Sequence, residues 1–147
     1  MEKIIVSACL LGESCRFDGK SKPNAEVIAL KEKYTLIPVC AEVLGGLPTP
    51  RLPSEIQLKG KERCVVRIDG KDVTPEYTKG ALRVFEIAKE NDCKIAVLKA
   101  RSPSCGKGFV YDGTYTRSLT EGNGICAELL MDNGILVVDE TELNKIQ

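Results

Sequence analysis

The chain has 147 residues, 43% of them hydrophobic, and it carries 21 basic and 21 acidic side chains. This size and composition suit one globular domain over residues 1–147, and the balanced charge gives no electrostatic reason to expect a nucleic acid or a membrane surface as a partner. The apolar stretch near the N-terminus is too short to span a membrane, so we expect a soluble, cytoplasmic protein.

Strand-like and helix-like segments alternate along the chain. The first half predicts, in order, a buried strand over 3–8, a helix over 25–33 capped by Asn24, a strand over 35–39 whose Pro38 favours a sheet edge or a bulge, a rigid loop over 44–53, and a hairpin-like excursion over 64–74 with a turn at Asp69 and Gly70. The second half predicts a helix over 74–91 capped by Thr74, a strand over 94–100, a long loop over 101–124, a helix over 125–133 ended by Gly134, and a strand over 134–140. This alternation predicts a three-layer α/β sandwich, Rossmann-like, with a mainly parallel sheet and helices on both faces.

Three cysteines stand where buried-strand patterns end. Cys9 follows IIVSA, Cys40 follows TLIPV, and Cys105 lies in the loop after IAVLKA. If these strands are parallel neighbours, their carboxyl ends share the sheet edge at which open α/β folds build their sites. The three thiols would then converge. Because the chain has no histidine, metal chemistry at such a site must use thiolates, and acid–base chemistry must use carboxylates, Lys, Tyr or water.

The other cysteines have different interpretations. Cys64 and Cys126 lie in apolar, periodic segments and are predicted to be core residues, and Cys93 has no predicted role. Cys15 lies in a loop shortly after Cys9 and could be a fourth ligand, a resolving thiol or a bystander. An odd total of seven cysteines, with no CxxC pair, favours reduced thiols over a disulfide framework, a zinc ribbon or a thioredoxin-type site.

Further polar residues are candidates for the wall of this site. Arg51, Lys99 and Asp112 could line it, although exposed salt bridges would explain them equally well. The GNG at 122–124 could present backbone N–H groups at a helix start to an anion or a ring carbonyl.

Four separated blocks resemble the signature of a known family. They are VSACLLGESCRFDGKSK, PVCAEVLGGLPTPR, SPSCGKGFVYDGTYT and GNGICAELL, in that order from Val6 to about Asp139. They resemble domain-of-unknown-function family 523, whose characterised members include thiouracil desulfidases. Position 15 is not a cysteine in some relatives, which argues against Cys15 as a required ligand.

The resemblance implies an iron–sulfur enzyme of sulfur metabolism acting on a small thiolated base. It implies a [4Fe–4S] cluster bound by Cys9, Cys40 and Cys105, with one open iron that binds the substrate sulfur. It also implies a functional carboxylate at Glu42 and a functional serine at Ser102 or Ser104, between which the spacing does not decide. The expected reaction is hydrolytic and non-redox: thiouracil plus water gives uracil plus hydrogen sulfide.

Two alternatives belong to other classes of protein. One is a structural zinc or thiolate binding module that uses Cys15 together with the three strand-end cysteines. The other is a metal-free thiol sulfurtransferase in which Cys105 attacks the donor sulfur and forms a persulfide.

Overall fold

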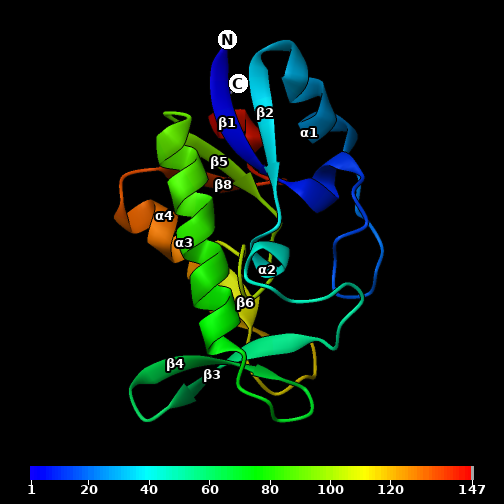
Figure 1. The fold of residues 1–147 in the computed structure, drawn as a ribbon, viewed down its shortest axis with the longest axis vertical. Coiled ribbons are helices and arrows are strands. Elements are labelled where there is room, and N and C mark those ends of the chain that lie inside the picture. Colours follow the sequence, from blue (N-terminus) through cyan, green and yellow to red (C-terminus); the bar gives the residue numbers. More distant parts are fainter. Residues whose placement is uncertain (147) are drawn as a thin grey trace.

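The computed structural model describes residues 1–146 and is built on a four-stranded parallel sheet (Figure 1). Its strands lie in the order β2 (Tyr34–Val39), β1 (Glu2–Ser7), β5 (Ile95–Leu98) and β8 (Leu136–Asp139). The predicted α/β class with a mainly parallel sheet is confirmed. If these four strands are numbered in chain order, the order across the sheet is 2-1-3-4, as in flavodoxin-like doubly wound sheets. The Rossmann-like part of the predicted fold therefore stays a prediction.

Helices cover both faces of the sheet because side chains alternate along the buried strands. Ile5, Ala96, Leu98 and Val137 point into one core with α3 and α4, and Ile4, Val6, Val97 and Val138 point into a second core with α1. The helices are α1 (Ala25–Ala29), α2 (Ala41–Leu44), α3 (Thr74–Glu90) and α4 (Ile125–Asp132), with short 3-10 turns η1 (Ala8–Leu11), η2 (Leu30–Glu32) and η3 (Leu143–Lys145).

Several local predictions are confirmed. The Asn24 side chain caps α1 by accepting a hydrogen bond from the Val27 N–H at 3.1 Å. β2, which contains Pro38, is an edge strand, and α4 ends just before Gly134, whose φ is +81°. Each of these features follows from one residue and its near neighbours: a side chain that caps a helix, a proline without a backbone N–H, and a glycine in the left-handed conformation.

The predicted excursion over 64–74 with a turn at Asp69 and Gly70 is confirmed, because Val66 and Asp72 form an antiparallel bridge and the Gly70 N–H donates to the Arg67 carbonyl oxygen at 2.7 Å. The sequence missed strand β3 (Ser54–Lys59), which pairs antiparallel with β4 (Glu62–Arg67) through a turn at Gly60. The long loop over 101–124 also contains a hairpin, formed by β6 (Phe109–Tyr111) and β7 (Leu119–Glu121). Both hairpins lie beyond the carboxyl edge of the sheet.

Helix α3 joins the hairpin region to the sheet (Figure 1). Thr74 is its first residue, and its hydroxyl accepts a hydrogen bond from the Val65 N–H at 2.8 Å, so the prediction that it caps its own helix was wrong. Gly80 lies against α2 so closely that a Cβ there would stand 1.8 Å from the Ala41 carbonyl oxygen. A glycine is therefore required for α2 to pack on α3.

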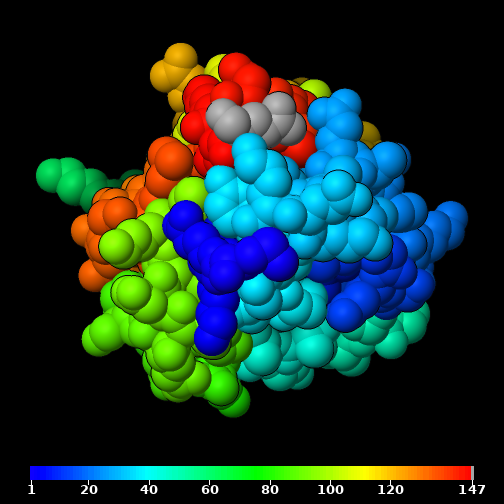
Figure 2. Space-filling view, turned by 90° about the horizontal axis from the view of Figure 1, so that it is seen from above, coloured from blue at the N-terminus to red at the C-terminus, as the bar shows by residue number. Residues whose placement is uncertain are grey.

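The N-terminal residues and the C-terminal turn η3 lie at the opposite end of the sheet from the hairpins (Figure 1). Figure 2 shows this face, where the first residues lie between the end of α3 and the segment that enters β2. The Tyr34 hydroxyl donates to the Ile146 carbonyl oxygen at 2.8 Å, which fastens the C-terminal turn to β2. Among residues 1–146, no helix is long and apolar enough to cross a membrane.

Candidate functional site

A cavity of about 250 Å³ lies between the carboxyl edge of the sheet and the two hairpins. The sheet side contributes residues that follow β1, β2 and β5, and the hairpin side contributes residues 53–55, Ile68, Tyr111, Tyr115 and Arg117. In the order 2-1-3-4, β1 and β5 are the neighbouring strands at which the chain direction across the sheet reverses. This is the position at which doubly wound sheets bind ligands.

The structure brings the three predicted strand-end cysteines to this cavity. Cys9 lies in η1 directly after β1, Cys40 directly precedes α2, and Cys105 lies in the turn that follows β5. Cys15 also lines the cavity, and all four are free thiols. Cys64, Cys93 and Cys126 are buried elsewhere, as the sequence predicts for the first and the last of them.

The thiols are close enough to influence one another's ionisation. Burial and the neighbouring Cys40 raise the pKa of Cys9 to about 11, and burial raises the pKa of Cys105 to about 12. A hydrogen bond from the Cys15 side chain lowers the pKa of Cys40 to about 7. Across residues 1–146, no group of three or more His, Cys, Asp or Glu is placed to hold a single metal ion.

The turn that carries Cys105 is held by helix α4. The Ile125 N–H donates to the Pro103 carbonyl oxygen at 2.9 Å, and two further N–H groups of α4 donate to the Ser104 carbonyl oxygen. A Cβ at Gly124 would stand 2.4 Å from that oxygen, so glycine is needed for the close contact. The Gly122 and Gly124 N–H groups likewise donate to the carbonyl oxygens of Gly108 and Gly106, at 3.0 and 2.6 Å, so the predicted role of 122–124 in binding an anion or ring carbonyl was wrong.

Glu42 lies in the first turn of α2, and both of its carboxylate oxygens are held. The Tyr77 hydroxyl donates to Oε1 at 2.8 Å, and the Arg51 guanidinium donates to Oε2 in an ion pair. The Arg51 side chain is only 5% exposed, and it also donates to the Cys15 carbonyl oxygen at 3.1 Å. Burial and the Glu42 charge raise the pKa of Tyr77, which keeps its hydroxyl protonated as a donor.

The two candidate serines differ in position. Ser102 lines the cavity, and its hydroxyl oxygen accepts a hydrogen bond from the Cys105 N–H at 2.7 Å. Ser104 is 1% exposed and does not line the cavity, and its hydroxyl has no partner among residues 1–146. Ser102 is therefore the serine whose hydroxyl proton is available to a molecule in the cavity.

The predicted wall residues are confirmed in two of three cases. Arg51 and Lys99 line the cavity, and Lys99 also forms an ion pair with Glu140 at 2.9 Å. Asp112 does not line it, because its carboxylate accepts hydrogen bonds from the backbone and hydroxyl of Thr114 at an exposed turn. The sequence missed Tyr77, although it lies on the buried face of α3, three residues before Gly80.

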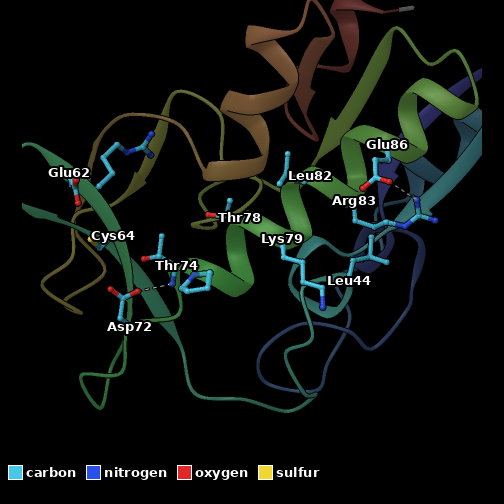
Figure 3. Close-up of a pocket in the computed structure, with 12 residues that line it drawn as sticks. Leu44, Glu62, Cys64, Asp72, Thr74, Thr78, Lys79, Leu82, Arg83 and Glu86 are labelled. Atoms are coloured by element: carbon cyan, nitrogen blue, oxygen red, sulfur yellow. Dashed lines mark hydrogen bonds and ion pairs between the residues drawn. The ribbon is translucent and has the colours of Figure 1, made fainter.

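A larger groove of about 790 Å³ lies between α3 and the β3–β4 hairpin (Figure 3). Leu44, Leu82 and Cys64 line it, and the side chains of Arg83 and Glu86 form an ion pair at 3.7 Å. It contains none of the predicted site residues, and the charged Arg63 and Asp72 in its wall pair with Glu128 and Lys59, which lie outside the groove. The smaller cavity at the sheet edge is therefore the candidate functional site.

The fold and cavity together define an α/β protein with a site of clustered thiols and a held carboxylate at the carboxyl edge of a parallel sheet. The chain belongs to the 2-thiouracil desulfurase family, whose model matches residues 4–142. It is similar to YbbK, an uncharacterized protein of Bacillus subtilis (strain 168), with 39% identity over 150 residues, 97% of this chain and 99% of that protein. It is also similar to the solved structure of TudS, a [4Fe-4S]-dependent thiouracil desulfidase, with a TM-score of 0.89 and 41% identity over 99% of this chain and 95% of that one.

Proposed function

We propose that this protein removes sulfur from a thiolated pyrimidine base by hydrolysis, with a [4Fe–4S] cluster bound by Cys9, Cys40 and Cys105. The observation that carries the proposal is that three strand-end thiols line one cavity together with the Glu42 carboxylate. Family membership and the likeness to TudS support the same chemistry. The substrate is a small molecule, which agrees with a cavity of about 250 Å³.

The donor set fits such a cluster. Thiolates are the usual ligands of iron–sulfur clusters, and this chain has no histidine to substitute for them. A cubane cluster takes each thiolate at a different iron atom, whereas a single ion draws all ligands to one point. Cys9, Cys40 and Cys105 reach one cavity from three separate segments of the chain, so the structure supplies the three thiolates that such a cluster needs.

When bound, the cluster would supply an open, thiophilic Lewis acid for the substrate sulfur. The remaining chemistry is a proton transfer that the chain's own residues can perform. One water molecule replaces sulfur by oxygen at the ring carbon, and its two protons leave with the sulfur as hydrogen sulfide. No electron is gained or lost overall, so no reductant is required.

Glu42 is the proton carrier in this proposal. Its carboxylate takes a proton from the attacking water and returns it to the departing sulfur or to a ring nitrogen, a role usually worth about 10²–10⁴-fold in rate. Arg51 and Tyr77 are positioning residues, because each holds one carboxylate oxygen. Ser102 can donate its hydroxyl proton to water or substrate while its oxygen fixes the Cys105 N–H.

The metal-free sulfurtransferase alternative is disfavoured by the state of Cys105. A nucleophilic cysteine requires a lowered pKa, and burial raises the pKa of Cys105 to about 12. A thiol in this position is poorly prepared to attack a donor sulfur without a metal.

The test is anaerobic reconstitution followed by addition of 4-thiouracil. We expect about four irons and four sulfides per chain, loss of the thione absorption band, and one hydrogen sulfide released per uracil without added reductant. In ¹⁸O-labelled water, the label should enter uracil. A cluster-loaded protein that neither converts nor binds 4-thiouracil would overturn the proposal.

A further inference from the structure

The cavity contains a second carboxylate, Glu55, for which the proposed chemistry has no use. Glu55 lies in β3, lines the cavity and is 7% exposed. It forms no ion pair with any Lys or Arg in the described part of the chain. A carboxylate in such surroundings needs hydrogen-bond donors, since burying it without them is costly.

One oxygen of Glu55 obtains its donors from the β6–β7 turn. Oε1 accepts hydrogen bonds from the Gly113 N–H at 2.9 Å and the Tyr115 N–H at 3.1 Å. The Gln57 side chain donates to the Gly113 carbonyl oxygen at 2.8 Å, so β3 holds this turn at two points. The turn places Tyr115 and Arg117 in the cavity wall.

The other oxygen of Glu55 has no hydrogen-bond donor in the described part of the chain. Within residues 1–146, every hydrogen bond to this carboxylate goes to Oε1, and Oε2 is not one of the fully buried polar atoms without a partner. Glu42 differs, because both of its oxygens are engaged by Arg51 and Tyr77. Two carboxylate residues therefore line the cavity: Glu42 is held on both oxygens, whereas Glu55 keeps one oxygen without a donor among residues 1–146.

We propose that Oε2 of Glu55 binds a ring N–H of the substrate. This inference rests on the proposed function and names the recognised group: a heterocyclic thioamide that carries at least one unsubstituted ring N–H. Glu55 would act as a specificity residue that orients the ring, without exchanging a proton. A neutral N–H donor satisfies a buried carboxylate and brings no additional charge into the cavity, which suits an uncharged thiobase.

Two substitutions separate this binding role from the structural role of Glu55. In Glu55→Gln, the amide oxygen can still accept from Gly113 and Tyr115, but the amide nitrogen then faces the ligand with donors only. In Glu55→Ala, the turn loses its support as well. Trypsin cleavage after Arg117 reports on the turn without relying on the cluster or on activity. We expect unchanged cleavage in Glu55→Gln and faster cleavage in Glu55→Ala.

The decisive experiment compares the cluster-loaded wild type with Glu55→Gln, using two substrates and uracil. For 4-thiouracil we expect the KM of Glu55→Gln to be about tenfold or more above that of the wild type, because the variant loses a charge-assisted hydrogen bond to the substrate. The kcat should change little. Binding of uracil, measured calorimetrically, should weaken by a similar factor. 1,3-Dimethyl-4-thiouracil has no ring N–H. The wild type should therefore bind it as poorly as Glu55→Gln binds 4-thiouracil.

The outcomes distinguish the two proposals. If the cluster-loaded wild type neither converts 4-thiouracil nor binds uracil, the proposed function is overturned. If the wild type is active but Glu55→Gln binds uracil equally well, only the role of Glu55 is overturned. The same holds if Glu55→Gln is cleaved after Arg117 as fast as Glu55→Ala. Should Glu55→Gln fail to fold, equal KM values of the wild type for 4-thiouracil and its dimethyl derivative would refute the inference.

Discussion

The two sides of the cavity are built by different means. On the sheet side, Cys9 and Cys40 directly follow parallel strands, and sheet topology alone brings them together. On the hairpin side, Glu55 and Tyr115 are placed by hydrogen bonds between a side chain and a turn backbone. The proposed metal ligands therefore depend on the architecture of the sheet, whereas the proposed substrate contacts depend on individual hydrogen bonds.

Tyr77 connects the two sides. Its ring packs with Ile56, Val65 and Val110 in a small core under the hairpins, and its hydroxyl donates to Glu42 on the sheet side. Helix α3 carries this residue at its start and packs on the sheet farther along. A change in the docking of α3 would therefore disturb the carboxylate and the hairpin wall together.

The largest expected effect is the loss of a proposed ligand on the sheet side. Cys105→Ser should abolish both the visible absorption of the reconstituted cluster and desulfuration, because a hydroxyl is a poor iron ligand beside thiolates. Iron analysis and sulfide release measure the two effects. As a matched control, Cys15→Ser should keep its cluster. Loss of the metal in Cys15→Ser would instead support the four-cysteine site.

Next comes removal of the proposed proton carrier. Glu42→Gln keeps the size of the side chain but cannot accept a proton, so we expect kcat to fall by about 10²–10⁴-fold while the cluster content stays at the wild-type level. Steady-state kinetics and iron analysis on the same samples check this. Glu90→Gln, at an exposed position of α3, is the control. A kcat within twofold of the wild type would show that Glu42 carries no essential proton.

The α2–α3 contact gives a test of the architecture itself. Gly80→Ala places a methyl group against the Ala41 backbone carbonyl, so the helices must separate, and we expect a loss of about 3 kcal/mol in the free energy of unfolding. Urea denaturation measures it. Lys79→Ala, at the exposed neighbouring position, should change stability little. Equal stability of the two variants would mean that α2 can shift without cost.

A smaller effect is expected from the residue that joins the two sides. Tyr77→Phe preserves the buried ring and removes the hydroxyl that donates to Glu42, so kcat should fall about tenfold with KM nearly unchanged. A rise in KM at constant kcat would instead assign Tyr77 to substrate binding. Arg51→Lys, which keeps the charge but not the forked geometry, should retain part of the activity.

The smallest effect concerns Glu142, which fastens the chain after β8 to the loop beyond Cys105. Burial opposes its ionisation, but hydrogen bonds from Lys145 and Lys107 prevail and lower the pKa of Glu142 from 4.5 to about 2. Its contribution to stability is therefore present above pH 4.5 and is lost as the pH falls toward about 2. Glu142→Gln should cost less than about 1 kcal/mol at pH 7, because the pair is partly exposed. Thermal unfolding should show the difference from the wild type shrinking below pH 4.5; a difference that persists at low pH would refute this account.

The sequence predicted the alternation of strands and helices, an edge position or a bulge for the Pro38 strand, and the convergence of Cys9, Cys40 and Cys105 if their strands are parallel neighbours. Those features follow from periodicity and local backbone chemistry, which act over a few residues, and from the rule that parallel strands share an edge. Tertiary structure decided the rest: that Ser102 and not Ser104 reaches the cavity, that Tyr77 and Arg51 hold Glu42, and that Glu55 supports the 112–118 turn. These contacts join residues far apart in the chain, and hydrogen bonds between distant side chains leave no period or spacing in a sequence.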